Sequence, residues 1–326
     1  MVTVETGARL HFGFQNLSLA HPRLYGGVGV GLEEPRLVVD VEQAGTVECD
    51  DGAVEPYLRA VVEELGVEGA RVTVRERFPR HTGLGSGTQL ALSCLTGVAR
   101  AYGLEPRPRE RAPQLGRGGR SGVGVATFER GGFVVDIGHP TARFTTDPPR
   151  QGNWTVPPVL GRWTLPGDWR FVLVTPAGEK RGPSGEGEDR RMRTAVEHAD
   201  PGIADEIATL LTRKLLPAVV AGDRTAFGRA VARLGRLNGA WYADEQGGVY
   251  RPPAGDLVAA LSESEAVTGA GQSSWGPTVY GVTGTDDIDR AVTAAERALD
   301  ATGVRGKIDI VAPRDSGATV SGGLVE

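Results

Sequence analysis

A glycine-rich segment, PRHTGLGSGTQ at residues 79–89, carries the most specific chemistry in this sequence. Its glycines and hydroxyl side chains alternate just before an apolar stretch that reads as a helix. Glycine lets a backbone approach a ligand closely, and the free N–H groups and dipole of a helix start attract anions. The candidate phosphate-binding residues are Gly83, Gly85, Ser86, Gly87, Thr88 and Gln89.

The spacing in this segment separates it from the common nucleotide-binding motifs. It is neither GxxxxGK[ST] nor a GxGxxG that follows a strand, so the Walker and dinucleotide interpretations both fail. An ordinary glycine-rich helix cap is the structural alternative. We therefore expect a loop that holds the phosphates of a small-molecule substrate.

Arginines form the second candidate group. Five of them fall within fourteen residues: Arg107, Arg109, Arg111, Arg117 and Arg120. We interpret the first three as a solvated helix start. Arg117 and Arg120 lie among glycines that expose them, and a guanidinium group binds phosphate or carboxylate through paired hydrogen bonds, so we predict that both bind substrate.

Other cationic or titratable side chains near these motifs are also candidates. They are Arg9, His11, Arg80, His81, Lys180 and Arg181. For His11 and His81 a purely structural role, as a satisfied histidine, is an equal alternative.

Hydrophobic periodicity gives the elements that must position these residues in the first half of the chain. Residues 36–42 and 71–77 alternate like half-exposed strands, and residues 54–65 between them repeat like an amphipathic helix. The apolar stretch after the glycine-rich segment, residues 90–102, predicts a helix buried on most sides, and residues 131–138 predict another strand. We place the boundary of a first lobe, residues 1–160, in the Pro/Trp-containing connection that follows.

The second half mixes strands and helices without strict alternation. We expect strands at 170–176, 278–283 and 307–313, and helices at 189–198, 204–220, 225–237 and 286–299. Interspersed elements of this kind favour an α+β fold over a doubly wound sheet. We assign residues 161–315 to a second lobe and residues 316–326 to a flexible tail.

Composition restricts the class of protein. A net charge of −5 gives no general attraction to nucleic acid, and no apolar run approaches the length of a membrane span. The N-terminal residues lack a secretory signal, and the two cysteines, Cys49 and Cys94, belong to no metal or disulfide pattern. We expect a cytoplasmic enzyme acting on small molecules, with a homodimer as the default assembly.

The glycine-rich segment resembles a known motif. Its pattern, Pro-x-x-x-Gly-Leu-Gly-Ser-Gly, is similar to the phosphate-binding motif of the GHMP kinase superfamily. More narrowly, the chain resembles the beta-ribofuranosylaminobenzene 5'-phosphate synthase family in the segments 8–14, 26–32, 81–89, 117–136 and 272–281. The resemblance implies a two-lobed GHMP-kinase-like fold, with a ribosomal-protein-like N-terminal lobe that carries the phosphate loop and a C-terminal α/β sandwich lobe.

One position departs from the kinases of this superfamily. Their Ser-Gly-x-Asp segment supplies a catalytic aspartate, whereas the matching residues here end in Gly124. A standard kinase is therefore disfavoured. The synthase resemblance implies transfer of a phosphoribosyl group from phosphoribosyl diphosphate to 4-aminobenzoate or 4-hydroxybenzoate, with loss of carbon dioxide and diphosphate. An electron-rich ring carbon has no hydroxyl proton to remove, so that reaction needs no obligatory general base.

The residue roles follow from this reading. Arg117, Arg120, His81 and Lys180 are the expected catalytic cations and donors, and the expected substrate-binding residues outside the glycine-rich loop are Arg9, His11, Ser121, Gln272, Ser273, Ser274 and Trp275. Trp275 would stack on the aromatic acceptor or simply pack between the lobes. Departure of diphosphate implies Mg²⁺, with Ser86, Glu186 and Asp136 as candidate ligands, although Asp136 would serve equally to cap a turn.

Two other functions stay open at this point. One is an atypical GHMP-family kinase that uses ATP and takes its aspartate from elsewhere in the chain. The other is a non-catalytic sensor of a phosphorylated ligand on the same fold.

Overall fold

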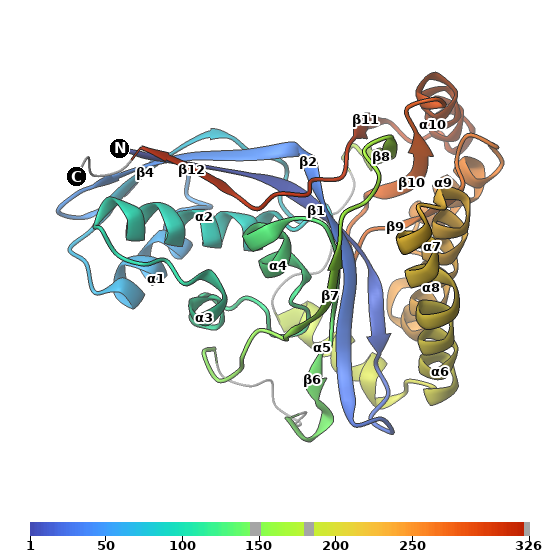
Figure 1. Ribbon diagram of the computed structural model, residues 1–326, viewed down its shortest axis with the longest axis horizontal. Helices are drawn as coiled ribbons and strands as arrows, with labels where there is room; N and C mark the ends of the chain where they lie inside the picture. Colours follow the sequence, from blue (N-terminus) through green and yellow to red (C-terminus); the bar gives the residue numbers. More distant parts are fainter. Residues whose placement is uncertain (144–150, 179–185, 323–326) are drawn as a thin grey trace.

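Two long antiparallel strands form the spine of the protein. The computed structural model describes residues 1–143, 151–178 and 186–322. Strand β1 (Val2–Asn16) pairs with β2 (Arg23–Gln43) from the ends near Val2 and Val41 to the hairpin end near Asn16 and Tyr25. Figure 1 shows this ribbon running from the first lobe into contact with the second.

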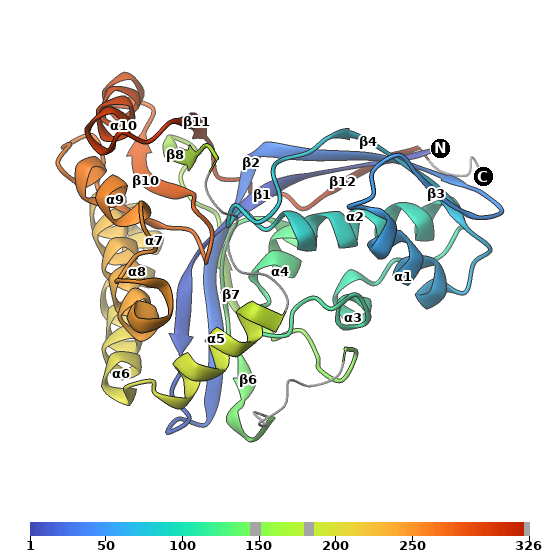
Figure 2. The ribbon, with the colours of Figure 1, turned by 180° about the vertical axis from the view of Figure 1, so that it is seen from behind.

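The first lobe is a mixed sheet covered by helices. The main strand order is β12-β1-β2-β4-β3, and β5, β6 and β7 continue it along the first half of β2. The other strands are β3 (Val47–Cys49), β4 (Ala70–Glu76), β5 (Phe133–Asp136), β6 (His139–Pro140), β7 (Val159–Trp163) and β12 (Thr319–Gly322). The helices are α1 (Glu55–Leu65), α2 (Ser86–Ala101), α3 (Pro108–Arg111) and α4 (Val123–Arg130). Figure 2 shows α1, α2 and α4 together on one face of this sheet.

The glycines of β2 explain how α4 reaches the sheet. A Cβ added at Gly27 would lie 2.0 Å from Ser121 Oγ, and one at Gly29 would lie 2.7 Å from Val123 Cγ1. These glycines face the same side because strand residues two apart point in one direction. The alternating glycines of the segment 26–32 therefore make a side-chain-free surface against which the start of α4 packs.

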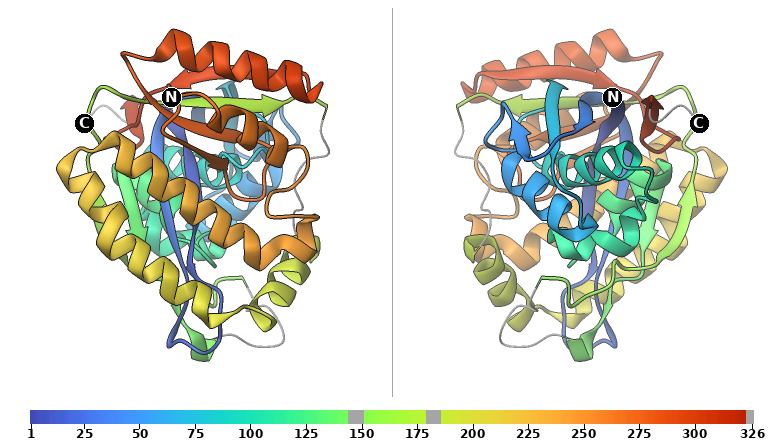
Figure 3. Two further views of the ribbon diagram at one scale, coloured as in Figure 1. Left: turned by 90° about the vertical axis from the view of Figure 1, so that its right-hand side faces the viewer. Right: turned by 90° about the vertical axis from the view of Figure 1, so that its left-hand side faces the viewer.

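The second lobe is an antiparallel sheet with helices on both faces. Its order is β11-β8-β10-β9, and its strands are β8 (Trp169–Pro176), β9 (Gly269–Gln272), β10 (Val279–Gly284) and β11 (Gly306–Val311). The helices are α5 (Glu186–Glu197), α6 (Pro201–Leu210), α7 (Leu216–Ala221), α8 (Arg224–Gln246), α9 (Ala254–Ser262) and α10 (Ile288–Thr302), with a π-helical turn at Leu211–Leu215. Figure 3 shows α10 and the long α8 on opposite sides of this sheet.

The two lobes share one apolar core. The ring of Phe12 in β1 lies 6.3 Å from that of Phe171, 5.9 Å from that of Phe227 and 5.1 Å from that of Tyr280, measured between ring centroids. All three partners belong to the second lobe, so the strand of the first lobe supplies part of the core of the second. A separate cluster, which includes Val172, packs under α9 and α10.

The expected α+β two-lobed fold is confirmed, and several details differ. Residues 319–322 were expected in a flexible tail, but they form β12 and pair with β1, which would otherwise present an open edge. The first-lobe sheet also runs past the expected boundary at 160, because β7 pairs with β5 through Trp163. Within the described residues no helix is both long and apolar enough to cross a membrane.

Candidate functional site

The glycine-rich segment forms a tight turn at the start of α2. Gly83 and Gly85 have φ angles of +90° and +85°, a left-handed conformation that favours glycine over residues with a Cβ. Helix α2 begins at Ser86, and the first amides of a helix have no partner within it. Such donors, together with the helix dipole, can bind an anion.

Two guanidinium groups lie against this helix start. A Cβ added at Gly85 would be 2.9 Å from Cγ and 3.3 Å from Cζ of Arg9, and one added at Gly87 would be 3.2 Å from Nη1 of Arg117. The Arg117 guanidinium also lies 4.9 Å from the ring centroid of Tyr57 and donates to its hydroxyl. The structure thus brings the predicted residues Arg9 and Arg117 together at the loop, from opposite ends of the first lobe's sequence.

The turn between β9 and β10 packs directly against the loop. Ser273 Oγ donates to the carbonyl of Gly83 at 2.8 Å and accepts from the backbone amide of His11 at 3.2 Å. A Cβ added at Gly276 would lie 2.1 Å from the nitrogen of Gly83, so the two backbones touch. Ser273 therefore shapes the loop from behind, through a buried hydroxyl whose hydrogen bonds are made within the protein.

His11 is buried beside a cavity of the second lobe. Its Nε2 atom has no hydrogen-bond partner among the described residues, and its ring meets that of Phe14 edge-on at 4.9 Å. Burial, with a smaller contribution from the positive charge of Arg9, lowers the pKa of His11 from 6.5 to about 3. The imidazole is therefore neutral at physiological pH.

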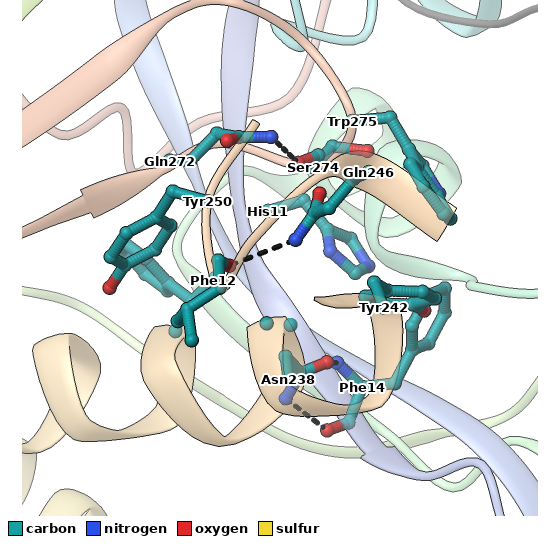
Figure 4. A pocket seen from close by; sticks show the side chains of 14 residues that line it. His11, Phe12, Phe14, Asn238, Tyr242, Gln246, Tyr250, Gln272, Ser274 and Trp275 are labelled. Carbon is teal, nitrogen blue, oxygen red and sulfur yellow. Dashed lines mark hydrogen bonds between the residues drawn. The ribbon is translucent and has the colours of Figure 1, made fainter. Parts of the chain in front are cut away.

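Gln272, Ser274 and Trp275 line the same cavity (Figure 4). The Gln272 side chain accepts from the amide of Arg251 and donates to the carbonyl of Ser274, both at 3.0 Å, so it holds the turn in shape. The Trp275 ring lies 4.4 Å from that of Tyr242, measured between centroids. The sequence motif around Trp275 thus forms one wall of a cavity whose other walls come from β1 and α8.

Two further predicted binding residues, Gln89 and Ser121, make hydrogen bonds within the protein. The buried amide of Gln89 accepts from Thr6 Oγ1 at 2.9 Å and donates to the carbonyl of Gly124 at 3.0 Å. Ser121 Oγ donates to Asp136 Oδ2 at 3.2 Å and accepts from the amide of Val123 at 3.2 Å, at the start of α4.

Asp136, a candidate metal ligand, also makes its hydrogen bonds within the protein. Its carboxylate is fully buried and accepts from the backbone amides of Gly122 at 2.8 Å and Gly138 at 2.9 Å. Burial raises its pKa from 3.8 to about 6, although the amide donors and Ser121 oppose that shift. The alternative interpretation, a carboxylate that caps backbone amides, fits this geometry.

The remaining predicted residues lie in other places. Arg120 forms an ion pair with Asp189 of α5, so it contacts the second lobe. His81 lies in the turn that precedes Gly83, with a φ of +61°. Lys180, and the side chain of Glu186, lie outside the residues that the structure describes.

Gly124, the position that the resemblance matches to the kinase aspartate, lies beside the glycine-rich loop. A Cβ added at Gly124 would lie 3.2 Å from Cγ2 of Thr88, in the first turn of α2. That spacing is tighter than an ordinary contact, so a longer side chain here would displace Thr88. Glycine at 124 thus lets α4 pack closely beside the glycine-rich loop.

The described residues do not fit a metal ion held by the protein. They contain no group of three or more His, Cys, Asp or Glu side chains with metal-binding geometry. Of the candidate ligands, Asp136 is occupied by amide donors, and only the hydroxyl of Ser86 is both described and partly accessible. Mg²⁺ stays an expectation from the chemistry of diphosphate, and we derive no step from it.

Several lining residues were not found from the sequence. Tyr57, which contacts Arg117 at the loop, reads as part of an amphipathic helix, and the cavity residues Asn238, Tyr242 and Tyr250 lie beyond the helix expected at 225–237. The available signal was the run of glycines in α8, at 228, 235 and 239, which helix propensity alone does not explain.

Comparisons with known proteins show which family this chain belongs to. The family model described as GHMP kinases N terminal domain matches residues 53–132, and the model described as GHMP kinases C terminal matches residues 215–301. The chain is 33% identical to beta-ribofuranosylphenol 5'-phosphate synthase of Methanothermobacter thermautotrophicus, over 86% of this chain and 88% of that protein. It is also 33% identical to the protein of the same name from Archaeoglobus fulgidus, over 87% of this chain and 88% of that one.

The fold is also similar to that of solved structures. Mevalonate pyrophosphate decarboxylase from Streptococcus pyogenes superposes with a TM-score of 0.67 at 12% identity, covering 97% of each chain. At that identity the similarity concerns the fold alone.

Proposed function

Because this chain belongs to the beta-ribofuranosylphenol 5'-phosphate synthase family, within the GHMP kinase superfamily, we propose that it transfers a phosphoribosyl group to an aromatic acid. The donor is phosphoribosyl diphosphate, and the acceptor is 4-hydroxybenzoate or 4-aminobenzoate. The names of the relatives specify a phenol product, which favours the hydroxy acid. The enzyme would then be a decarboxylating pentosyltransferase of methanopterin-type cofactor biosynthesis.

The reaction forms one carbon–carbon bond and breaks two single bonds, one in each substrate. The ring carbon that carries the carboxylate attacks C1 of the ribosyl group, and the bond from C1 to the diphosphate oxygen breaks with its electron pair leaving on diphosphate. The bond between the ring and the carboxylate carbon then breaks, carbon dioxide leaves, and that electron pair restores the aromatic ring. The protein must therefore stabilise a leaving polyanion and orient the ring.

The observation that carries the proposal is the pair of guanidinium groups at the start of α2. Arg9 lies against Gly85 and Arg117 against Gly87, so two cations lie close to the free amides at this helix start. Such a site suits the diphosphate or the 5'-phosphate of the donor. We propose Arg9, Arg117 and the loop residues Gly83 to Thr88 as the phosphate-binding residues, with Arg120, His81 and Lys180 as further candidates.

The same position argues against phosphoryl transfer to a hydroxyl acceptor. A kinase of this superfamily places an aspartate where this chain has Gly124, and here the space beside Thr88 is too tight for a Cβ without rearrangement. Position 124 therefore provides no carboxylate that could act as the aspartate does in the kinases.

The test is incubation of the purified protein with Mg²⁺, phosphoribosyl diphosphate and 4-hydroxybenzoate labelled in its carboxyl group, with a parallel 4-aminobenzoate series. Release of labelled carbon dioxide in step with diphosphate supports the proposal. Absence of both products with either acceptor refutes it, and consumption of ATP without phosphoribosyl diphosphate would point to the kinase instead. A cytoplasmic location and a homodimer stay predictions from the sequence.

A further inference from the structure

Tyr57 is the residue of α1 that reaches the glycine-rich loop. Helix α1 packs beside α2 (Figure 2), and its first turn carries Tyr57. A Cβ added at Gly87 would lie 3.1 Å from the Tyr57 hydroxyl and 3.2 Å from Nη1 of Arg117. The phenol and the guanidinium therefore both lie against the first turn of α2, where backbone amides have no partner within the helix.

Aromatic residues anchor Arg117 at its backbone and at its guanidinium. The backbone carbonyl accepts from Nε1 of Trp154 at 2.9 Å, and the guanidinium donates to the Tyr57 hydroxyl. The guanidinium carbon also lies 4.9 Å from the centroid of the Tyr57 ring, within the range of a cation–π contact. Phenol and indole groups carry no charge at neutral pH, so these contacts orient Arg117 without neutralising it.

The other arginines of this segment are neutralised. Each of the other four between residues 107 and 120 forms an ion pair with a carboxylate: Arg107 with Glu110, Arg109 with Glu129, Arg111 with Glu64, and Arg120 with Asp189. Among the described residues no carboxylate forms an ion pair with Arg117, and the first turn of α2 contains no acidic residue. A cation beside the positive end of a helix dipole is unfavourable unless an anion joins it. The position of Arg117 is therefore better explained by a bound anion than by the stability of the protein alone.

A second guanidinium lies near the same ring. The guanidinium carbon of Arg80 is 5.9 Å from the centroid of the Tyr57 ring. Within the described part of the chain Arg80, like Arg117, forms no ion pair with a carboxylate. Like charges repel at short range, so an anion bound at the loop would stabilise both guanidinium groups.

We infer that Tyr57 is a positioning residue for anion binding at the start of α2: it fixes the guanidinium of Arg117 there and leaves the charge available to a phosphate or diphosphate group of the donor. The inference rests on the proposed function, because it concerns how the polyanionic donor is bound. Tyr57 acts through Arg117 and does not contact the reacting atoms.

Two substitutions separate the parts of the contact between Tyr57 and Arg117. Tyr57→Phe keeps the ring and removes the hydroxyl that accepts from Arg117, whereas Tyr57→Leu removes both the ring and the hydroxyl. Tyr102→Phe is the matched control. It also removes one phenol hydroxyl, which donates to the carbonyl of Gly69 at 2.8 Å, but at the opposite end of α2.

The experiment is a calorimetric titration of each purified protein with inorganic diphosphate and with ribose 5-phosphate, which represent the two anionic ends of the proposed donor. For whichever probe the wild type binds more tightly, Tyr57→Phe should weaken binding by about three- to tenfold and Tyr57→Leu by about ten- to fiftyfold. Tyr102→Phe should bind both probes like the wild type.

A double variant tests whether Tyr57 acts through Arg117. Arg117→Ala alone should lose at least as much affinity as Tyr57→Leu. Adding Tyr57→Leu to Arg117→Ala should then weaken binding by no more than about twofold further, because two residues that serve one contact do not have additive effects. A merely structural role for Tyr57 would instead give additive losses.

The outcomes that refute this role of Tyr57 differ from those that refute the function. Wild-type affinity for both probes in Tyr57→Leu, additive losses in the double variant, or no binding of either probe by the wild type would each refute the role. Release of labelled carbon dioxide by the wild type would still support the proposed reaction in each of these cases. Conversely, the expected losses of affinity without any release of carbon dioxide would uphold the role of Tyr57 and refute the phosphoribosyl transfer.

Discussion

Acidification should destabilise this protein through His11 more than through an ordinary histidine. The folded protein keeps this imidazole neutral, with a pKa of about 3, because the ring is buried and lies near the charge of Arg9. In the unfolded chain the pKa returns to about 6.5, so between pH 6.5 and pH 3 the unfolded state binds a proton that the folded state does not. Stability contributed by neutral His11 is therefore complete above pH 6.5 and is lost progressively as the pH falls toward 3.

The size of the effect follows from the two pKa values. Lowering the pH from 7 to 5 should remove about 2 kcal/mol of unfolding free energy through His11 alone. Asp136 contributes with the opposite sign, because its raised pKa of about 6 lets the folded state hold a proton that the unfolded state releases. Asp136 is present both in the wild type and in a variant that lacks His11. Its contribution therefore cancels when the pH dependence of one protein is subtracted from that of the other.

The assay is urea unfolding at pH 7 and at pH 5, for the wild type and for His11→Phe. The variant keeps an aromatic ring beside Phe14 but has no titrating group, so its unfolding free energy should fall by about 2 kcal/mol less over this interval. His198 is exposed, so His198→Asn is the control and should follow the wild type. Parallel pH dependences for the wild type and His11→Phe would show that His11 titrates normally and that the neutral-cavity reasoning is wrong.

Three further predictions concern the loop and its surroundings. Arg117→Ala should raise KM for phosphoribosyl diphosphate by about 10- to 100-fold with little change in KM for the acceptor, because a charge-assisted hydrogen bond is lost. Steady-state kinetics with each substrate varied in turn would test this, and an unchanged KM for phosphoribosyl diphosphate would show that Arg117 does not bind it. Arg120→Ala should lower turnover by well over tenfold with the fold intact by circular dichroism, whereas Asp189→Ala should do less; equal losses in both would mean that the ion pair matters rather than the guanidinium. Asp136→Asn should lower the unfolding free energy by about 2–4 kcal/mol, because an amide nitrogen would face backbone N–H donors. The same variant should leave the Mg²⁺ concentration for half-maximal activity unchanged, and a shift in that concentration would indicate that Asp136 binds the metal ion.

The parts of the site that the sequence predicted are the local ones. The turn at Gly83 and Gly85 and the helix that follows depend on glycine conformations and on apolar spacing within a few residues, and both are visible in the sequence. The same is true of β10, whose β-branched and aromatic residues predict a strand, and every residue of that strand is buried. The family motifs added the expectation that Gly124 and the turn around Trp275 lie at this loop.

The parts that the sequence did not predict depend on distant contacts. The first half of β2 is rich in glycine, a poor strand former, and it is extended because it pairs with β1 and β5 and receives α4 on its glycine face. Strand β7 lies in a segment read as a connection, and it exists because β5 offers a free edge. The cavity needed α8 to approach β1, a contact between residues more than two hundred positions apart, as in the bonds between Asn238 and the backbone of Phe14.

The shared core around Phe12 limits how such proteins exchange parts. The two matching family models cover residues 53–132 and 215–301, and strand β1 lies outside both of them. Yet β1 carries Arg9 to the glycine-rich loop, His11 to the cavity and Phe12 into the second lobe. In a chimera that takes its C-terminal half from a relative, the cavity residues of the second lobe would come from one protein and those of β1 from the other. The two sets of side chains would then not be matched in shape. A recombinant of two family members should fold only when its first sixteen residues and its second lobe come from the same parent.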